Sequence, residues 1–257
     1  MSEFTPTPER QKQILSLLSK QGRLSVSEIV GQFSISEATA RRDLESLASQ
    51  GKAQRVHGGV IVVEQAPPEL PILQRESEQT GEKSSIGRAA AELIADGETV
   101  FLGSGTTVLE TAKYLRERKN LTVVTNSLPV LNALASAKDI TVISLGGQLR
   151  ESELSFIGHI TEQALAELRV DKVVMGTRGI SLEHGLTHDY LPETLTDRAI
   201  LKIGRTVIIA ADHTKIHRVA TALLAPLKSI QVFVTDDKAE KKFLQVLKKL
   251  GIEVVVA

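Results

Sequence analysis

The sequence contains no cysteine, and this absence removes several classes of protein from consideration. Without thiols there are no disulfide bonds, no thiolate zinc sites and no thiol catalysis. No hydrophobic run approaches the roughly 18 apolar residues that a membrane-spanning helix needs. The polar start MSEFTPTPER lacks the apolar stretch of a secretory signal. We therefore expect a soluble protein of the cytoplasm.

The sequence also lacks net charge, because 31 Lys and Arg balance 31 Asp and Glu over 257 residues. A balanced total argues mildly against a dedicated nucleic-acid binder. The first 63 residues hold eight basic and six acidic side chains, so their net charge is plus two and that of the remaining residues is minus two. This difference is too small to decide a function, so the position of each charge matters more than the total.

Three short helices are expected within the first 63 residues. Apolar residues recur at helical spacing over residues 10–21, which predicts the first helix. Ser25 and Glu28 have the spacing of a capping box, in which each side chain satisfies a free backbone amide, and this predicts the start of a second helix. A third helix is expected to begin at Ser34 or Ser36. The short gap between the second and third helices is typical of a helix-turn-helix.

The third helix is expected to have two distinct faces. Ala40, Leu44 and Leu47 lie at i, i+4 and i+7, which predicts a buried stripe. At about 100° per residue, Arg42 lies nearly opposite that stripe and Arg41 lies on its flank. A helix that reads DNA needs this arrangement, because its outer residues meet base edges and its flanks meet phosphates. Two adjacent arginines are also common on solvated helices, so the pair alone does not establish DNA binding.

A glycine-tipped hairpin is expected after the third helix. Residues 53–57 and 60–63 can pair as strands about Gly58-Gly59, a turn that tolerates positive φ. Such a hairpin is the wing of a winged helix, and it brings Arg55 and His57 within reach of the phosphate backbone or the minor groove. A histidine near a turn is also common without any contact, so the DNA-binding hypothesis depends on the helices, the outward arginine and the hairpin together.

Residues 10–60 resemble the N-terminal domain of the DeoR family of bacterial transcription regulators. The family pattern is a serine start, then T-[IV]-R-R-D-L, then L…G…R-x-H-G-G. In this sequence it reads Ser36, Thr39-Ala40-Arg41-Arg42-Asp43-Leu44, Leu47, Gly51 and Arg55-Val56-His57-Gly58-Gly59. Ala40 replaces the usual β-branched residue and still faces the core. The resemblance implies a winged helix-turn-helix domain that binds a double-stranded DNA operator through Ser36, Ala38, Thr39, Arg41, Arg42, Arg55 and His57.

The remaining sequence predicts a linker and a larger α/β domain. We expect a DNA-binding domain over residues 1–63, a proline-containing linker over residues 64–80 and a second domain over residues 81–257. In the second domain short β-branched runs alternate with helical patterns, which indicates a doubly wound, mostly parallel sheet covered on both faces. The expected strands are residues 99–102, 121–125, 140–145, 172–175, 206–210, 230–234 and 253–256. The expected helices are residues 84–95, 107–118, 129–137, 193–203 and 238–250.

Small polar residues follow the first three expected strands of this domain. They are Gly103-Ser104-Gly105-Thr106-Thr107, Thr125-Asn126-Ser127 and Gly146-Gly147. Ligands bind at the carboxyl ends of such strands, glycines admit close approach of the backbone, and a helix N-terminus offers free amides to an anion. One shared phosphate-binding crevice is therefore expected, although each stretch alone is also typical of a tight turn or a helix cap. Walker and dinucleotide patterns are absent, so neither ATP nor NAD is favoured.

The resemblance to the DeoR family continues through the second domain. The family loop D-[SA]-G-T-T corresponds to residues 103–107, with Gly103 in place of the aspartate. Arg75 and Lys83 stand at positions that are usually basic in the family, and Arg150 and Arg178 are further cationic candidates. The resemblance implies a fold similar to ribose-phosphate isomerases, glucosamine-phosphate deaminases and CoA transferases. It also implies a phosphorylated sugar effector that contacts Ser104, Gly105, Thr106, Thr107, Asn126, Ser127, Gly146, Gly147 and Lys215.

The function implied by the resemblance is transcription regulation, with no enzyme activity and no cofactor. We expect a homo-oligomeric repressor, a dimer or tetramer, of a carbohydrate operon. The alternative is a sugar-phosphate isomerase or deaminase, for which Asp189, Glu193 and Asp212 are candidate bases and Lys215 is an electrostatic partner. No compact catalytic motif joins these residues. The histidines of this domain have no metal-ligand spacing, so no metal is expected.

Overall fold

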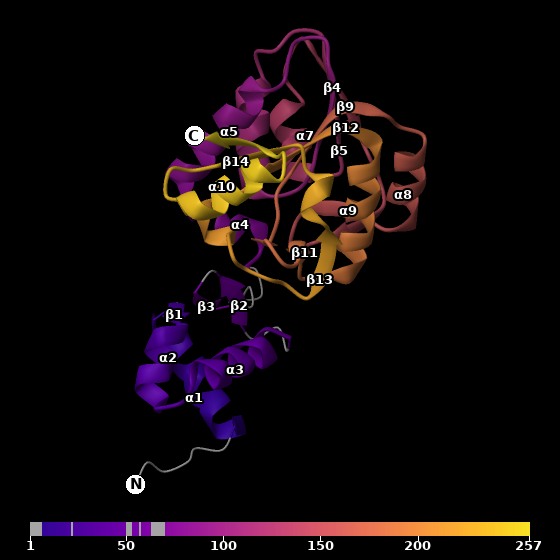
Figure 1. The fold of residues 1–257 in the computed structure, drawn as a ribbon. Coiled ribbons are helices and arrows are strands. Elements are labelled where there is room, and N and C mark those ends of the chain that lie inside the picture. The colour runs from indigo at the N-terminus through magenta and orange to yellow at the C-terminus, as the bar shows by residue number, and fades with distance from the viewer. Residues whose placement is uncertain (1–6, 22, 50–52, 57, 63–69) are drawn as a thin grey trace. The chain divides into compact units, whose positions relative to one another are not determined.

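The computed structural model describes residues 7–21, 23–49, 53–56, 58–62 and 70–257 (Figure 1). The chain divides into two compact units, Met1–Glu64 and Gln65–Ala257. Each unit has its own hydrophobic core, as expected of a folded domain. Among the described residues, no helix is both long enough and apolar enough to cross a membrane.

The N-terminal unit contains three helices and a small antiparallel sheet. The helices are α1 (Thr7–Gln21), α2 (Val26–Phe33) and α3 (Glu37–Ser49), and the strands are β1 (Arg23–Ser25), β2 (Ala53–Val56) and β3 (Gly59–Val62). The sheet order β1-β3-β2 puts one strand of the hairpin in the middle. The predicted winged helix-turn-helix is confirmed. Strand β1 was not predicted, because three residues directly before a helix give no clear alternating pattern.

The predicted capping box and buried stripe are both present. Ser25 Oγ accepts from the Glu28 amide at 3.2 Å, and the Glu28 carboxylate accepts from the Ser25 amide at 2.7 Å. Ala40, Leu44 and Leu47 of α3 are at most 1% exposed and belong to one cluster with residues of α1 and β3. The helical phase inferred from the sequence is therefore correct, and α3 turns its other face to solvent.

A seven-stranded sheet forms the centre of the C-terminal unit. Its strands are β4 (Thr99–Leu102), β5 (Leu121–Thr125), β6 (Ile140–Ser144), β9 (Val170–Met175), β12 (Gly204–Ala210), β14 (Val232–Thr235) and β15 (Glu253–Val256). They lie in the order β15-β14-β12-β9-β4-β5-β6, and every neighbouring pair is parallel. All the strands that the sequence predicts for residues 81–257 lie in this sheet.

Helices cover both faces of this sheet (Figure 1). Consecutive strand residues alternate between two hydrophobic clusters, so Val173 and Ile209 belong to one while Val174 and Ile208 belong to the other. The first cluster is completed by α8 (His159–Ala166), α9 (Leu191–Ile203) and α10 (Lys241–Lys249). The second is completed by α5 (Thr80–Glu92), α6 (Thr106–Leu115) and α7 (Leu128–Leu134). The doubly wound architecture is confirmed.

Smaller elements beside the main sheet were not predicted. They are α4 (Ile72–Arg75), the hairpin of β7 (Gln148–Arg150) and β8 (Ser155–Ile157), the antiparallel sheet of β10 (Gly179–Ser181), β11 (Gly185–His188) and β13 (Ala222–Ala225), and the short turns η1 (His213–Lys215) and η2 (Leu227–Ser229). Strands of three or four residues carry too little periodicity to be recognised. Helix α4 lies within the segment 64–80 that the sequence assigns to the linker, and residues 64–69 of that segment lie outside the described part of the chain.

The chain adds successive strands to the main sheet in one direction from β4 and then in the opposite direction from β9. From β4 the chain proceeds to β5 and β6 on one side, and then reaches β9 on the other side and continues through β12, β14 and β15. The connections therefore diverge between β4 and β9. The carboxyl ends of the strands at such a switch point are where open α/β sheets bind ligands.

Candidate functional site

The solvent-exposed face of α3 presents the arginines of the predicted DNA interface. Arg41 and Arg42 are both exposed, and Ala38 is exposed one turn before Arg42. Arg41 Nη2 lies 2.5 Å from Glu37 Oε1, and both side chains of this pair are more than half exposed. Exposed ion pairs contribute little free energy, so Arg41 can readily exchange Glu37 for a phosphate.

Ser36 and Thr39 form the start of the same helix. The Thr39 amide donates to Ser36 Oγ at 3.2 Å, and the two hydroxyl oxygens are 2.9 Å apart. Ser36 therefore caps α3 and determines where the helix begins. Of the two contacts predicted in the wing, His57 lies outside the described residues, and so does the side chain of Arg55.

A buried ion pair that the sequence pattern does not indicate holds α1 against α3. Arg10 Nε donates to Asp43 Oδ2 at 2.6 Å, and Gln11 Nε2 donates to Asp43 Oδ1 at 3.2 Å. The side chains of Arg10 and Asp43 are at most 4% exposed. The available signal was the position of Asp43, which falls on the buried side of the helix three residues after Ala40. The aspartate thus orients the helix whose arginines face outward.

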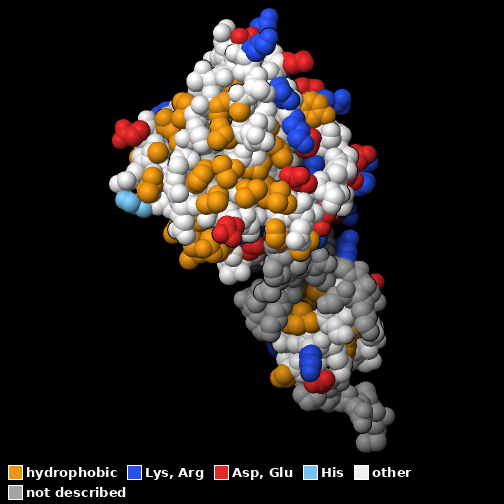
Figure 2. Space-filling model, turned by 180° about the vertical axis from the view of Figure 1, so that it is seen from behind, with side chains coloured by type: hydrophobic (Ala, Val, Ile, Leu, Met, Phe, Trp, Pro, Cys, Tyr) orange, Lys and Arg blue, Asp and Glu red, His pale blue; other side chains and the backbone are white. Residues whose placement is uncertain are grey.

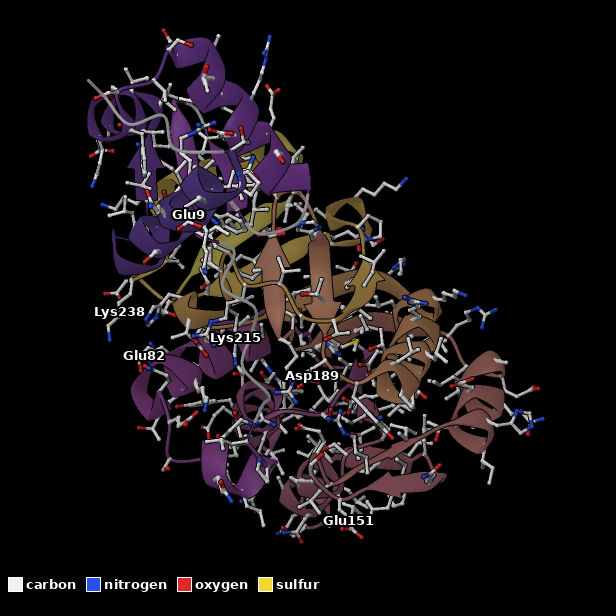
Figure 3. The ribbon with its side chains drawn as sticks, turned by 90° about the horizontal axis from the view of Figure 1, so that it is seen from below. Glu9, Glu82, Glu151, Asp189, Lys215 and Lys238 are labelled. Atoms are coloured by element: carbon white, nitrogen blue, oxygen red, sulfur yellow. The ribbon has the colours of Figure 1, made fainter. Side chains whose placement is uncertain are left out.

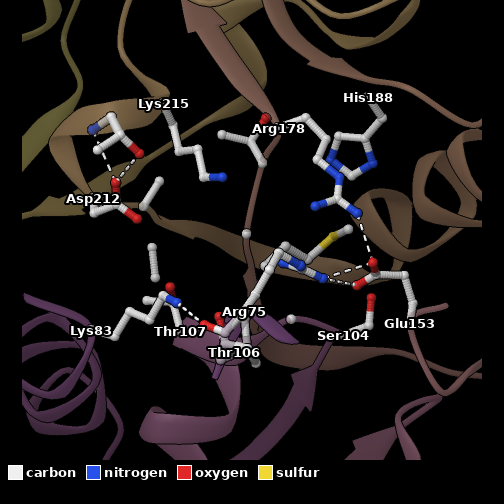
Figure 4. A pocket seen from close by; sticks show the side chains of 18 of the residues that line it. Arg75, Lys83, Ser104, Thr106, Thr107, Glu153, Arg178, His188, Asp212 and Lys215 are labelled. Carbon is white, nitrogen blue, oxygen red and sulfur yellow. Dashed lines mark hydrogen bonds and ion pairs between the residues drawn. The ribbon is translucent and has the colours of Figure 1, made fainter. Parts of the chain in front are cut away.

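A cavity lies at the carboxyl ends of β4, β9 and β12 (Figure 4). Its walls include residues 104–108 after β4, residues 175–178 after β9, and most of residues 210–215 after β12. Arg75 of α4 and Lys83 of α5 complete it. The empty space, including the open mouth, is about 750 Å³. The cavity therefore occupies the switch point of the sheet.

The N-terminus of α6 forms one wall of this cavity. Gly105 precedes the helix with φ of 113°, a backbone conformation that favours glycine, and among the described residues no side chain caps the helix. Thr106, Thr107 and Val108, the first residues of α6, line the cavity. Amides in the first turn of a helix have no partner within the helix, and the helix dipole makes this end positive. This wall is therefore suited to bind an anion.

Two cations, Lys215 and Arg178, point into the same space (Figure 4). Burial lowers the pKa of Lys215 to about 8, against the opposing influence of Asp212. Burial also lowers the pKa of Arg178 to about 10, against the influence of Asp189. Because burial disfavours the charged forms of both side chains, an anion nearby would stabilise them. Lys215 and Asp189 are half-buried and are drawn within the outline of the unit in Figure 3, whereas Glu82 and Lys238, which form an ion pair, are drawn at its edge.

Glu153 lies between two arginines in the wall of the cavity. Arg75 Nη2 lies 2.7 and 2.6 Å from the two carboxylate oxygens of Glu153, and Arg178 Nη2 lies 2.8 Å from one of them. Burial raises the pKa of Glu153, while Arg75 opposes the rise. Lys83 Nζ donates to the Arg75 carbonyl at 2.6 Å, and burial lowers the pKa of this lysine. Glu153 was not singled out from the sequence, because it lies in a short hairpin that carried no recognisable pattern.

His188, Glu193 and Asp197 form a second polar group in the cavity wall. Their potential ligand atoms lie within 4.8 Å of one another, as they would in a metal site. Glu193 already pairs with Arg150 and accepts from Ser155 Oγ at 3.2 Å, so a metal ion would compete with a guanidinium. His188 Nδ1 lies 2.9 Å from Asp197 Oδ2, but neither ring nitrogen makes a hydrogen bond of good geometry within the described part of the chain. The group is therefore better suited to bond hydroxyls than to hold a metal.

The cavity brings together some of the predicted effector contacts and leaves others out. Ser104, Gly105, Thr106, Thr107 and Lys215 line it. Its lining does not include Asn126, Ser127, Gly146 and Gly147. These four residues follow β5 and β6, which lie on the side of β4 away from the switch point. The expectation of one crevice along β4, β5 and β6 assumed that consecutive strands share a site, whereas the strand order places β9 and β12 there.

The residues after β5 and β6 hold neighbouring elements in place. Ser127 Oγ accepts from the amide of Val130 at 3.5 Å and caps α7, and Asn126 Nδ2 donates to the Phe156 carbonyl at 2.9 Å. At Gly147 a Cβ atom would lie only 2.2 Å from Thr161 Oγ1, so only glycine allows α8 to approach this closely. These glycine and polar residues have structural roles that the sequence pattern does not distinguish from ligand binding.

Two protein-family models match the chain. The model of the DeoR-like helix-turn-helix domain matches residues 10–66, and the model of the DeoR C-terminal sensor domain matches residues 78–237. The first match contains α3, and the second contains the loops that line the cavity. Together they cover most of the chain.

Curated relatives resemble the chain over nearly its whole length. It is 34% identical over 255 residues to the transcriptional repressor AccR of Agrobacterium fabrum, a match that covers 99% of each chain. It is 35% identical over 239 residues to the glycerol-3-phosphate regulon repressor of Escherichia coli, which covers 93% of this chain and 94% of that repressor. Among solved structures, ribose 5-phosphate isomerase A from Neisseria gonorrhoeae is 18% identical, with 52% of each chain covered and a TM-score of 0.39. The curated relatives are regulators by name and not enzymes, so the enzymatic alternative gains no support from them.

Proposed function

The chain belongs to the DeoR family of bacterial transcription regulators, and from this premise we propose that it represses an operon of carbohydrate metabolism in the cytoplasm. We further propose that a phosphorylated sugar, bound in the C-terminal unit, controls its occupancy of DNA. The observation that carries the proposal is the cavity at the switch point, where a helix N-terminus, the buried Arg178 and the half-buried Lys215 face one space.

The DNA-binding step is assigned to the outer face of α3. Arg42 is exposed opposite the buried stripe, and an arginine fork can bond both acceptors of a guanine in the major groove. Ala38, one turn earlier, is small enough to let the helix approach a thymine methyl, and Thr39 lies beside it. Arg41 is assigned to a phosphate, because its exposed contact with Glu37 is easily exchanged. Arg55 and His57 of the wing remain predicted backbone contacts.

We assign the effector to the cavity because one wall of the cavity suits a phosphate and another suits hydroxyl groups. A phosphate dianion fits the amides at the start of α6 together with Lys215 and Arg178, since charge-assisted hydrogen bonds are the strongest available. Sugar hydroxyls, which both donate and accept, fit His188, Glu193 and Asp197. A ligand with a phosphate at one end and hydroxyls at the other satisfies both walls.

We also propose that the protein acts as a homo-oligomer, a dimer or tetramer. Three large apolar side chains, Leu191 and Leu195 of α9 and Leu223 of β13, are 55%, 48% and 52% exposed on adjoining elements. The face of the C-terminal unit seen in Figure 2 carries a gathering of hydrophobic side chains. Contiguous exposed apolar surface is typical of protein–protein contacts.

The proposed function is tested by measuring DNA binding with and without sugar phosphates. DNA fragments selected by the protein from a random pool would be titrated by fluorescence anisotropy at several salt concentrations. Inorganic phosphate, glycerol 3-phosphate, glucose 6-phosphate and ribose 5-phosphate would then be added in turn. We expect sequence-dependent binding that at least one sugar phosphate changes more than inorganic phosphate does. Absence of any sequence preference at moderate salt would refute the DNA-binding assignment.

Variants of the cavity separate effector binding from DNA binding. Thr106→Ala and Lys215→Ala are expected to weaken the response to sugar phosphate and to leave DNA affinity in its absence unchanged. Lys228→Ala, at an exposed lysine of η2, serves as the matched control. An unchanged response in both cavity variants would refute the assignment of the phosphate end.

A further inference from the structure

Helix α4 joins the linker to the wall of the cavity. In the sequence it follows directly on residues 63–71, which lead from the N-terminal unit. A helix of four residues is not stable by itself, so its position depends on the contacts it makes. Ile72 is 1% exposed, and its amide donates to the Ser152 carbonyl at 2.7 Å. A change in these contacts would therefore move α4 and the residues just before it, 70 and 71.

Arg75 connects α4 to the cavity through several bonds at once. Its Nε donates to the Leu70 carbonyl at 2.8 Å, so the guanidinium also holds the residues just before the helix. Its Nη2 donates to both carboxylate oxygens of Glu153 at 2.7 and 2.6 Å. Its own carbonyl accepts from Lys83 Nζ at 2.6 Å. Arg75 is 7% exposed and lines the cavity, so it touches both the effector space and the end of the linker.

Glu153 is shared between Arg75 and Arg178. Arg178 Nη2 lies 2.8 Å from one oxygen of Glu153, and Arg178 also lines the cavity together with Lys215. Burial raises the pKa of Glu153, so its charge is already disfavoured in this environment. An anion that accepts hydrogen bonds from Arg178 would compete with Glu153 and place a second negative charge nearby. The bond between Glu153 and Arg75 is therefore sensitive to what the cavity contains.

We propose that Arg75 is the positioning residue through which occupancy of the cavity reaches the linker. The inference rests on the proposed function, because it requires an anionic effector in the cavity. When a phosphate binds, Arg178 and Lys215 bond to it, the contact between Glu153 and Arg75 changes, and α4 is held in a second arrangement. The effector then shifts the equilibrium between two states of α4 by no more than its difference in affinity for them.

Arg75→Lys tests this coupling while keeping the positive charge. Lysine cannot form the fork of bonds that arginine makes to a carboxylate and to a carbonyl. Binding of glycerol 3-phosphate, glucose 6-phosphate and ribose 5-phosphate would be measured by calorimetry, and binding of the selected DNA by anisotropy. At saturating sugar phosphate, we expect the resulting change in the DNA affinity of Arg75→Lys to be about tenfold smaller than the change in the wild type. Arg88→Lys, on the exposed side of α5, should retain the full response.

Glu153→Gln tests the same coupling from the opposite side. The amide keeps the shape of the carboxylate and removes the charge that holds Arg75. Without any sugar phosphate, its DNA affinity is expected to move toward the value that the wild type reaches with sugar phosphate. Hydrogen exchange of residues 70–79 should change in the same direction as it does when the wild type binds sugar phosphate.

The outcomes separate the coupling from the proposed function. If no sugar phosphate binds the wild type, both the effector assignment and the coupling through Arg75 are overturned. If a sugar phosphate binds and changes DNA affinity equally in the wild type and Arg75→Lys, only the coupling is overturned. The coupling is also overturned if Glu153→Gln has the same DNA affinity and the same hydrogen exchange as the wild type without sugar phosphate.

Discussion

The two adjacent arginines of α3 differ in what surrounds them, and this difference predicts different mutational effects. Arg42 is exposed on the face opposite the core, so Arg42→Ala is expected to abolish sequence preference in DNA binding and to change stability by less than about 0.5 kcal/mol. Anisotropy with selected and scrambled DNA would measure the first effect, and thermal melting the second. Lys12→Ala, at an exposed position of α1, is the control. Unfolding of the N-terminal unit by Arg42→Ala would show that this residue is needed for packing.

The lowered pKa of Lys215 predicts that effector binding depends on pH. Burial lowers the pKa of this lysine to about 8, so the cation is mostly present at pH 7 and mostly lost at pH 9. Because only the charged form attracts a phosphate, affinity for sugar phosphate is expected to fall about tenfold between these pH values. Calorimetry at both pH values measures the effect, and Lys215→Met should show weak binding that no longer depends on pH in this range. A wild-type affinity that stays constant would contradict the role of Lys215.

At the scale of secondary-structure elements, the ion pair of Arg10 with Asp43 determines how α1 meets α3. Both side chains are at most 4% exposed, so removing the carboxylate takes away the negative charge that the buried Arg10 Nε contacts. Asp43→Asn is therefore expected to destabilise the N-terminal unit by about 3 to 5 kcal/mol and to weaken DNA binding. The melting transition of the C-terminal unit should stay unchanged. Glu45→Gln, on the exposed side of α3, is the control, and equal melting of both variants would argue against this role for Asp43.

The elements also show what the sequence could predict and what it could not. The strands of the parallel sheet were found because each is a short apolar run between helices, a local signal. Their order is set by long-range pairing, which no local pattern records. For this reason Ser104 to Thr107 and Lys215 line one cavity, whereas its lining does not include Asn126 and Gly146, which the strand-end pattern groups with Ser104 to Thr107. Glu153 and Asp197 were missed because burial and contacts identify them, and spacing does not.

For the whole molecule, zero net charge and a small DNA-reading surface favour assembly of several copies. With 31 basic and 31 acidic residues, the chain has no overall attraction to DNA, so affinity must come from local contacts. One copy offers one α3 and one wing. Two copies can read two half-sites about one helical turn apart, which doubles both the base contacts and the released counterions.

Assembly is expected to depend on the apolar side chains of α9, and this can be tested directly. The double variant Leu191→Glu with Leu195→Glu replaces two half-exposed leucines by charges without touching the buried side of the helix. We expect light scattering to show monomers, and the slope of log affinity for DNA against log salt concentration to fall by about half. Leu250→Glu, which is 59% exposed at the end of α10, adds a similar charge at another surface and should change neither quantity. A double variant with the mass and salt slope of the wild type would show that the copies meet through a different surface.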